Sequence, residues 1–217
     1  MSEKLVTIQS ASTRRKDGVT VELAPDIFEC LHWVSRAVRI DDTRTIWRNI
    51  HVEAGKQTVV VGTNGRIMRV WKTDKLDTNF TKTRNHFVKK VLSNKIILDI
   101  NRNNNDPRGF PNWRPILPDK HRARKKLTSL RFPSTAAKWG RTDTFAAAEV
   151  VIDYATRHGK NRILNIDLIT DLKLKRLNPT FEVTFDKENP EHIIMFTTEL
   201  PYGLGTLMAL LMPGLSV

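Results

Sequence analysis

The sequence has one cysteine, Cys30, among 217 residues. An intrachain disulfide and a thiolate metal cluster are therefore excluded, and we expect Cys30 to be a small buried apolar side chain, with a reactive thiol as the alternative. Long apolar runs are also missing. None approaches the ~20 residues that a membrane helix needs, and the start Met1-Ser2-Glu3-Lys4 lacks the apolar core of a signal peptide. These absences predict a folded cytoplasmic protein without a membrane partner.

Patterns that would indicate catalysis are equally scarce. The six histidines are scattered, and none shows the spacing that places two metal ligands on one helix face. The run Gly203-Leu204-Gly205 lacks a third glycine and a following helix, so it is no phosphate-binding loop. Asp167 and Asp171 share a predicted helix face, but acidic residues are favoured at a helix start anyway. We therefore expect a non-enzymatic protein without a cofactor or metal, and a carboxylate-dependent nuclease is the remote alternative.

Positive charge is what the chain has in excess, with a formal net charge of +13. The excess is concentrated in one segment. Residues 82–131 hold fourteen Lys and Arg against Asp99, Asp106 and Asp119, a net +11, whereas residues 178–217 have one Lys against five acidic residues, a net −4. Such a distribution predicts a surface that faces a polyanion, with nucleic acid as the first candidate and a nucleoid-associated location. A solvated basic face that only maintains solubility is the alternative.

The first half of the chain predicts a helix followed by antiparallel strands. From Pro25, apolar residues recur at helical spacing through Val38, which indicates an amphipathic helix. Strand-like runs follow, joined in one place by the Asn64-Gly65 turn. The expected elements are strands at 46–53, 58–62 and 66–72, a short basic helix at 84–92 and a strand at 96–100.

The second half repeats this pattern after a segment, 101–118, that is too rich in Asn, Pro and Gly to form a helix or a central strand. We expect helices at 146–157 and from Asn165, a favourable N-cap, and strands at 181–185, 193–197 and 206–212. Each half combines amphipathic helices with antiparallel strands. The sequence thus predicts an α+β fold of two tandem domains, at 1–107 and 120–217, joined by a linker at 108–119.

Five segments, in this order, resemble the second and third domains of the bacterial sliding clamp, the beta subunit that tethers the replicative DNA polymerase to DNA. Thr63-Asn64-Gly65-Arg66-Ile67-Met68 is similar to a family turn, and Gly109 to Pro118 is similar to the family linker. The terminal Leu210-Leu211-Met212-Pro213 resembles the closing Val-Met-Pro of the family. Residues 42–50 and 164–169 resemble the approach to a strand and the start of a helix. The resemblance implies two sliding-clamp domains, each with amphipathic helices backed by antiparallel sheet.

The resemblance also implies a groove between the last two domains that receives short apolar peptides from polymerases and other clients. Met, Leu and Trp would form its adaptable walls, while Pro and Gly would shape its edges. For each residue the alternative is an ordinary core position at a strand end. The implied groove residues are Trp47, Thr63, Gly65, Met68, Pro118, Leu210, Met212, Pro213 and Leu215.

A clamp holds duplex DNA loosely through Lys and Arg on its helices, which contact phosphates without base readout. By the resemblance, this surface would bind double-stranded DNA of any sequence. The alternative for each residue is a solvated surface position. The candidate DNA-facing residues are Arg36, Arg39, Arg84, Lys89, Lys90, Arg122, Arg124, Lys125, Lys126 and Lys173.

The chain departs from the family in size and charge. Bacterial clamps have three domains in each chain, close as dimers and are usually acidic, whereas this chain has room for about two domains and is strongly basic. Asn64 replaces an Asp, and Gly214-Leu215 replaces Met-Arg. Six domains make the usual ring, so two-domain chains would form a homotrimer, which a clamp loader could open. The implied function is a processivity factor for a DNA polymerase, and the alternative is a DNA-binding accessory protein that never closes into a ring.

Overall fold

The computed structural model groups the chain into two compact units. Unit 1 comprises residues 1–111 and 201–207, and unit 2 comprises 112–200 and 208–217. The predicted domain limits, 1–107 and 120–217, stay a prediction. The structure describes residues 5–10, 19–40, 45–76, 83–99, 110–117, 124–130, 147–148, 151, 162–163, 165–186, 193–212 and 214–215.

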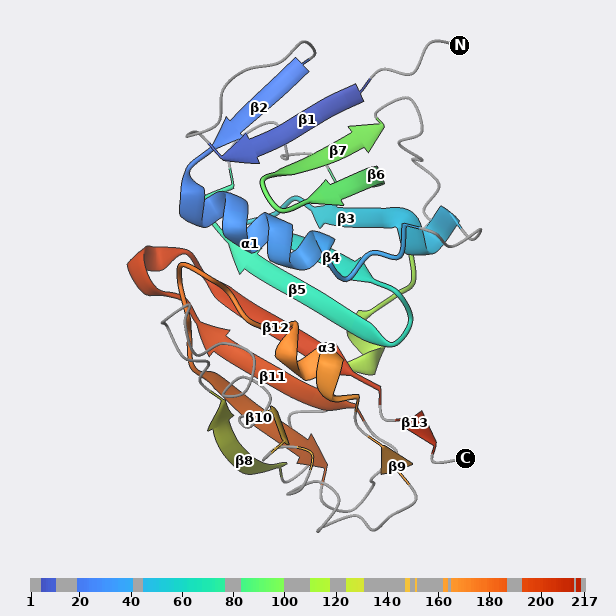
Figure 1. The fold of residues 1–217 in the computed structure, drawn as a ribbon, viewed down its shortest axis with the longest axis vertical. Coiled ribbons are helices and arrows are strands. Elements are labelled where there is room, and N and C mark those ends of the chain that lie inside the picture. Colours follow the sequence, from blue (N-terminus) through green and yellow to red (C-terminus); the bar gives the residue numbers. More distant parts are fainter. Residues whose placement is uncertain are drawn as a thin grey trace. The chain divides into compact units, whose positions relative to one another are not determined.

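Unit 1 is built on a mixed sheet with the strand order β2-β1-β7-β6-β3-β4-β5 (Figure 1). Neighbouring strands pair antiparallel except β1 and β2, which are parallel. The strands predicted at 58–62, 66–72 and 96–100 are confirmed. The strand predicted at 46–53 begins only at Asn49, because residues 45–48 form a 3₁₀ helix, and the first two strands were not predicted. The strands are β1 (Leu5–Ser10), β2 (Val19–Leu23), β3 (Asn49–Glu53), β4 (Thr58–Thr63), β5 (Ile67–Thr73), β6 (Arg84–Leu92) and β7 (Lys95–Asp99).

Helix α1 (Pro25–Ser35) packs on this sheet, as its apolar periodicity predicts. Proline at its start suits a position that has no intrahelical hydrogen bond to donate. The backbone of α1 comes very close to β4. A Cβ on Gly62 would lie only 2.6 Å from the carbonyl oxygen of Val34. The imidazole Nε2 of His32 lies 2.8 Å from the carbonyl oxygen of Leu92 at the end of β6. These contacts fix the helix against the middle of the sheet.

The prediction of a basic helix at 84–92 is wrong, because these residues form β6. Asn49 of β3 pairs with Phe87, and Phe87 pairs with Asp99 of β7, so β6 is a central strand. A bulge lies between Val88 and Lys90. Short apolar runs fit both the helical and the strand period, and the adjacent strands decide between them here. Lys89 lies at the bulge, and Lys90 continues the pairing with β7.

Unit 2 carries an antiparallel arrangement in the order β12-β11-β10-β8, and the first two residues of β12 belong to unit 1. β10 pairs antiparallel with both β11 and β8. A separate pair joins β9 (Arg162–Ile163) to β13 (Gly214–Leu215). The strands predicted in this half are confirmed, and β8 is an additional one. The bounds are β8 (Arg124–Leu130), β10 (Phe181–Asp186), β11 (Ile194–Glu199) and β12 (Thr206–Leu211).

The predicted N-cap of the unit 2 helix is confirmed. The side chain of Asn165 accepts a hydrogen bond of 2.9 Å from the backbone N–H of Asp167, at the start of α3 (Ile166–Thr170). The helix is shorter than its apolar pattern predicts, because it ends at Thr170, and the buried Leu172 lies in the turn that follows. Most of the predicted helix at 146–157 lies outside the described residues. Short 3₁₀ helices complete the described elements: η1 (Thr45–Arg48), η5 (Arg114–Ile116) and η7 (Pro201–Gly203).

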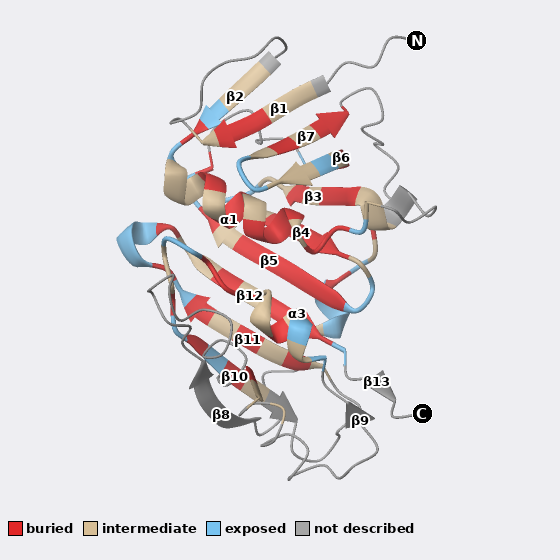
Figure 2. Cartoon of the chain, viewed as in Figure 1, coloured by how far each residue is buried: buried red, intermediate tan, exposed pale blue. Residues whose placement is uncertain are grey.

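The core of unit 1 lies between α1 and the sheet, and β5, which is red along most of its length in Figure 2, has the longest run of buried residues. A charged residue belongs to this core. Arg69 of β5 is fully buried; its Nη1 donates a 2.8 Å hydrogen bond to the carbonyl oxygen of Trp33, and its Cζ lies 5.0 Å from the centre of the Trp33 ring. Cys30 is buried as predicted. In the described part of the chain, no helix has the length and apolar character to cross a bilayer.

We predict that Gly62→Ala destabilises unit 1 by about 1 to 3 kcal/mol, because the added methyl group would overlap the Val34 carbonyl and push α1 from the sheet. Denaturant unfolding followed by circular dichroism measures the change. Gly55→Ala is the matched control, since a Cβ there would meet its nearest atom at an ordinary 3.4 Å. Equal stability of the two variants would contradict the close packing of α1 on β4.

Candidate functional site

The turn between β4 and β5 is held by side-chain hydrogen bonds. The Asn64 side-chain oxygen accepts from the backbone N–H groups of Arg66 and Ile67, at 2.9 and 3.0 Å. The Thr63 hydroxyl donates to the Ile67 carbonyl at 2.9 Å and accepts from Gly65 N–H at 3.1 Å. Gly65 has a φ of 84°, in the left-handed region that favours glycine. The predicted Asn64-Gly65 turn is confirmed, and side-chain hydrogen bonds hold its backbone.

Unit 1 brings four of the predicted groove residues to this turn. Thr63 and Met68 are paired residues of β4 and β5, and Gly65 lies in the turn between them. A Cβ on Gly65 would lie 3.5 Å from the indole ring of Trp47, which η1 positions there. Trp47 is half-buried, whereas Thr63 and Met68 are only 2% and 5% exposed. Met68 is therefore a buried residue of this chain, and the half-buried Trp47 beside Gly65 is the more accessible apolar side chain.

Unit 2 contains two further predicted groove residues, at the end of β12. Leu210 is 2% exposed, whereas Met212 is 52% exposed directly after the strand. Leu215 lies on β13, and Pro118 and Pro213 fall outside the described residues. Ile116 of η5, which is not among the predicted groove residues, is a further exposed apolar residue of unit 2, at 41%.

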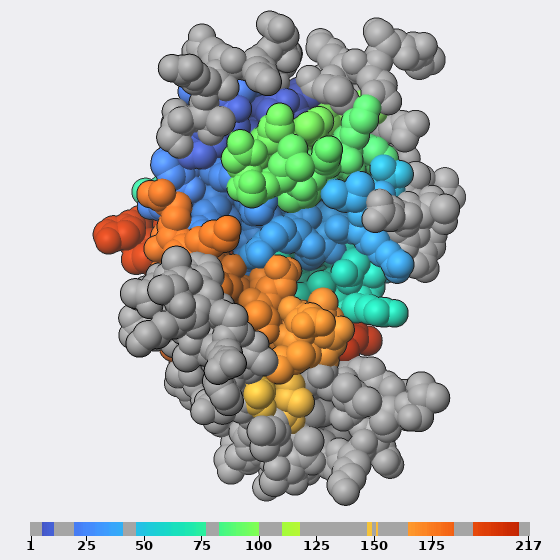
Figure 3. Space-filling view, viewed as in Figure 1, coloured from blue at the N-terminus to red at the C-terminus, as the bar shows by residue number. Residues whose placement is uncertain are grey.

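The predicted DNA-facing residues of unit 1 do not share one face. Arg84 pairs with Val52, on the sheet face that α1 covers, while Lys90 pairs with Ile97 on the opposite face. Lys90 is exposed and lies in the β6–β7 hairpin, residues 84–99, which forms a green surface patch in Figure 3. Arg36 is half-buried and Arg39 exposed, both just after α1. The prediction that Arg84, Lys89 and Lys90 project from a helix is wrong because β6 is a strand.

The basic run of unit 2 is placed on a strand. Arg124, Lys125 and Lys126 open β8, where they pair with Asp186, Phe185 and Thr184 of β10. β8 is the outermost strand in the order of unit 2. Arg122 lies outside the described residues. Lys173 is only 9% exposed, so it does not belong to a solvent-facing basic surface.

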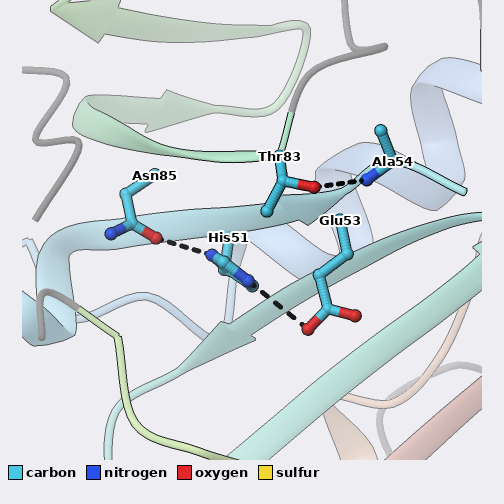
Figure 4. A network of polar contacts seen from close by, with 5 residues as sticks. All are labelled: His51, Glu53, Ala54, Thr83 and Asn85. Atoms are coloured by element: carbon cyan, nitrogen blue, oxygen red, sulfur yellow. Dashed lines mark hydrogen bonds and ion pairs between the residues drawn. The ribbon is translucent and has the colours of Figure 1, made fainter. Parts of the chain in front are cut away.

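A polar network on the face opposite α1 fixes the start of the linker segment (Figure 4). The His51 Nδ1 lies 2.7 Å from the Asn85 side-chain oxygen, and its Nε2 lies 3.4 Å from a carboxylate oxygen of Glu53. The His51 ring stacks on Phe110, with 4.9 Å between ring centres. In the same region, the backbone N–H of Ala54 donates to the Thr83 hydroxyl. Both nitrogens of His51 are thus engaged in positioning, which argues against a role as an acid or base.

Two further titratable groups are inert at neutral pH. Burial, together with the nearby charges of Arg84 and His51, lowers the pKa of His86 to about 4, so its imidazole is neutral. Burial, with the neighbouring Glu29 and Asp26, raises the pKa of Cys30 far above its usual range and disfavours the reactive thiolate. Among the described residues, no group of three or more His, Cys, Asp or Glu is placed to hold a metal ion.

No family model matches the chain, and no curated protein matches its sequence. Solved structures do match in fold. The chain superposes on the DNA polymerase III subunit beta from Borrelia burgdorferi with a TM-score of 0.51 and 12% identity, covering 88% of this chain and 61% of that one. For the Helicobacter pylori beta clamp, the TM-score is 0.52 at 10% identity, covering 99% of this chain and 67% of that one.

The chain thus spans about three fifths of the length of the Borrelia protein. At identities of 10 to 12%, these likenesses establish the fold and leave function to other arguments. The predicted resemblance is confirmed at this level. The mixed sheet with few helices has the α+β fold of the bacterial DNA polymerase III beta sliding clamp, in a shorter chain.

Proposed function

We propose that this protein is a sliding-clamp-like processivity factor, a non-enzymatic tether that holds a DNA polymerase or another DNA-processing enzyme on duplex DNA. The observation that carries the proposal is the clamp fold itself, which extends over 99% of the chain in the comparison with the Helicobacter pylori beta clamp. A tether needs an enclosing scaffold and weak contacts with phosphates. It needs no catalytic group.

The charge of the chain supports duplex DNA as the partner. A net charge of +13 attracts a polyanion over the range set by the Debye length, and most of the excess lies in residues 82–131. Within this segment, Lys90 is exposed on β6, and Arg124, Lys125 and Lys126 follow one another on β8. Contacts of lysine and arginine with phosphates carry no sequence information, so a clamp that uses them stays mobile along DNA.

We further propose that the sheet edges join three copies into a ring. β2 is the outermost strand of unit 1, and β8 is the outermost strand of unit 2. Such edges pair with the edge of another chain in head-to-tail assemblies. Glu22 of β2 is exposed, and β8 opens with three basic residues, so the two edges complement each other in charge. Three chains of two clamp-type domains supply the six domains of a closed ring, which a clamp loader would open.

The proposed contact for a client peptide is Met212. It is a flexible, polarizable side chain, 52% exposed at the end of β12, and such a residue adapts to aromatic or leucine anchors of a peptide. The rigid Thr63 to Met68 turn with the Trp47 ring is the corresponding candidate in unit 1. A few anchors of this kind carry most of the binding energy of a peptide.

For DNA, we predict that affinity for duplex falls steeply with salt and does not depend on sequence, because each phosphate contact releases counterions. Replacing Arg124, Lys125 and Lys126 together by Glu should weaken binding to all duplexes alike. Fluorescence anisotropy with two unrelated duplexes over a salt series measures both effects. The control is Arg66, Lys175 and Arg176 changed together to Glu, which alters the net charge equally at exposed positions outside the proposed surface. Equal losses of duplex affinity in both variants would show that net charge alone causes the effect.

For assembly, we predict a trimer in solution, with a molar mass about three times the 24.9 kDa of the chain. Light scattering with and without duplex DNA measures it. Glu22→Lys should shift the equilibrium towards the monomer, since it places a positive charge opposite the basic start of β8. A monomer that persists at micromolar concentration with DNA present would favour a DNA-binding accessory protein that never closes into a ring.

For the client site, we predict that Met212→Ala weakens binding of a polymerase-derived peptide by about 2 kcal/mol and leaves thermal stability and DNA affinity unchanged. Met68→Ala should instead lower stability by about 2 to 5 kcal/mol, because it removes a buried side chain. Ile116→Ala is the matched control for an exposed apolar residue of unit 2. Peptide titration calorimetry and thermal melting separate these effects. If the Met212→Ala protein binds the peptide with the affinity of the parent, Met212 is not part of the client site.

A further inference from the structure

Tyr202 is the most exposed large apolar side chain in the described part of the chain. It is 85% exposed, compared with 52% for Met212 and 41% for Ile116. It lies in η7, the pale blue turn that precedes β12 in Figure 2, within unit 1. Neither the basic strand β8 nor the proposed client site includes this turn. The Tyr202 ring is therefore available to a binding partner.

The backbone of this turn is unusual and firmly held. Tyr202 has φ 57° and ψ 25°, a left-handed conformation that is unfavourable for a bulky side chain and persists only where the surroundings impose it. The Leu204 N–H donates to the Pro201 carbonyl at 3.2 Å, and the indole N–H of Trp71 donates to the Leu204 carbonyl at 2.8 Å. Trp71 is completely buried. The phenol ring is therefore presented on a fixed turn and not on a loose loop.

The turn packs directly on the end of β5 and places a lysine beside it. A Cβ on Gly205, whose φ is 93°, would overlap the Lys72 carbonyl oxygen. The Cε of Lys75 lies 3.7 Å from the place where a Gly203 Cβ would stand. Lys75 is exposed, and its backbone N–H donates to the Thr73 hydroxyl at 3.0 Å. An ammonium group and an exposed aromatic residue thus share one short stretch of surface.

A second lysine belongs to the same end of the sheet. Thr58 and Thr73 are paired, so the turn before β4, with the exposed Lys56, lies at the end where Lys75 stands. Asp74 and Glu199 are exposed acidic residues of the described part of this region, and Glu53 is directed to His51. Lys75 is the charged side chain that the structure places directly against the turn. An exposed flat ring next to a lysine is a combination with which proteins bind a nucleobase and its phosphate.

We propose that the Tyr202 turn is a binding site for single-stranded nucleic acid, in which a base stacks on the Tyr202 ring and the flanking phosphates contact Lys75 and Lys56. Stacking accepts any base, so the site is sequence-tolerant. This site is distinct from the duplex surface proposed on β8, and it does not rest on the tether function. A protein partner for the exposed ring is the competing occupant, which the experiment below distinguishes.

The test uses the full chain and a fluorescein-labelled dT12 oligonucleotide, with anisotropy as the readout. Tyr202→Asn removes the ring and keeps a residue that tolerates the left-handed backbone. We expect it to weaken dT12 binding at least about fivefold, the lower end of the loss for one stacked base. Tyr202→Phe keeps the ring and should bind like the parent. Lys56→Gln with Lys75→Gln should lower the slope of log affinity against log salt by about 1.4, or about 0.7 for each lost phosphate contact.

Duplex binding is the internal control, because Tyr202→Asn should leave it unchanged while the charge reversal on β8 lowers it. A dT12 containing 5-iododeoxyuridine should, on irradiation, cross-link to the peptide that contains Tyr202. Unchanged dT12 affinity in Tyr202→Asn would overturn the proposal and favour a protein partner as the molecule that binds the ring. An equal loss on duplex and single strand would overturn it too, since the ring would then not act on unstacked bases. Neither result bears on whether the chain tethers a polymerase.

Discussion

The burial of Arg69 between α1 and the sheet is the constraint on which the architecture of unit 1 depends. A guanidinium taken out of water is costly unless its hydrogen bonds are replaced, and here Trp33, near the end of α1, supplies a carbonyl oxygen and the face of its ring. Both groups are fully or almost fully buried. If the helix moved along the sheet, the buried Arg69 guanidinium would lose its hydrogen bond to Trp33. The close approach at Gly62 acts in the same direction, since only glycine lets the Val34 carbonyl come so near.

A fixed helix in turn fixes the surface that follows its C-terminal end. The chain leaves α1 through Arg36 and Arg39, and the backbone N–H of Arg39 donates to the carbonyl of Trp47. Trp47 then lies against Gly65 in the β4–β5 turn. The position of this turn is thus linked to the position of the helix through one backbone hydrogen bond and the Trp47 ring. A candidate peptide contact in unit 1 is therefore rigid because the core beneath it is rigid, and not because of any bond to a ligand.

The sequence predicted those elements whose geometry is determined locally. The Asn64-Gly65 turn, the Asn165 N-cap and the apolar periodicity of α1 each follow from interactions within a few residues. The segment 84–92 was misassigned because its identity depends on pairing with two strands, β7 in a hairpin and β3, whose residues lie far away in the chain. Lys173 was assigned to a basic surface for the same reason, since its burial depends on tertiary packing that no local pattern reports.

The same distinction explains how the clamp fold persists at 10 to 12% identity. The segments that carry the resemblance include a turn, a helix start and a strand end, where the backbone conformation restricts the choice of residue. Surface charge is free of that restriction, so a chain with this fold can carry a net charge of +13. In this chain the charge is also uneven along the sequence, with a net +11 over residues 82–131 and a net −4 over residues 178–217. Because the backbone determines the fold at turns, helix starts and strand ends, the same fold accommodates segments of opposite charge.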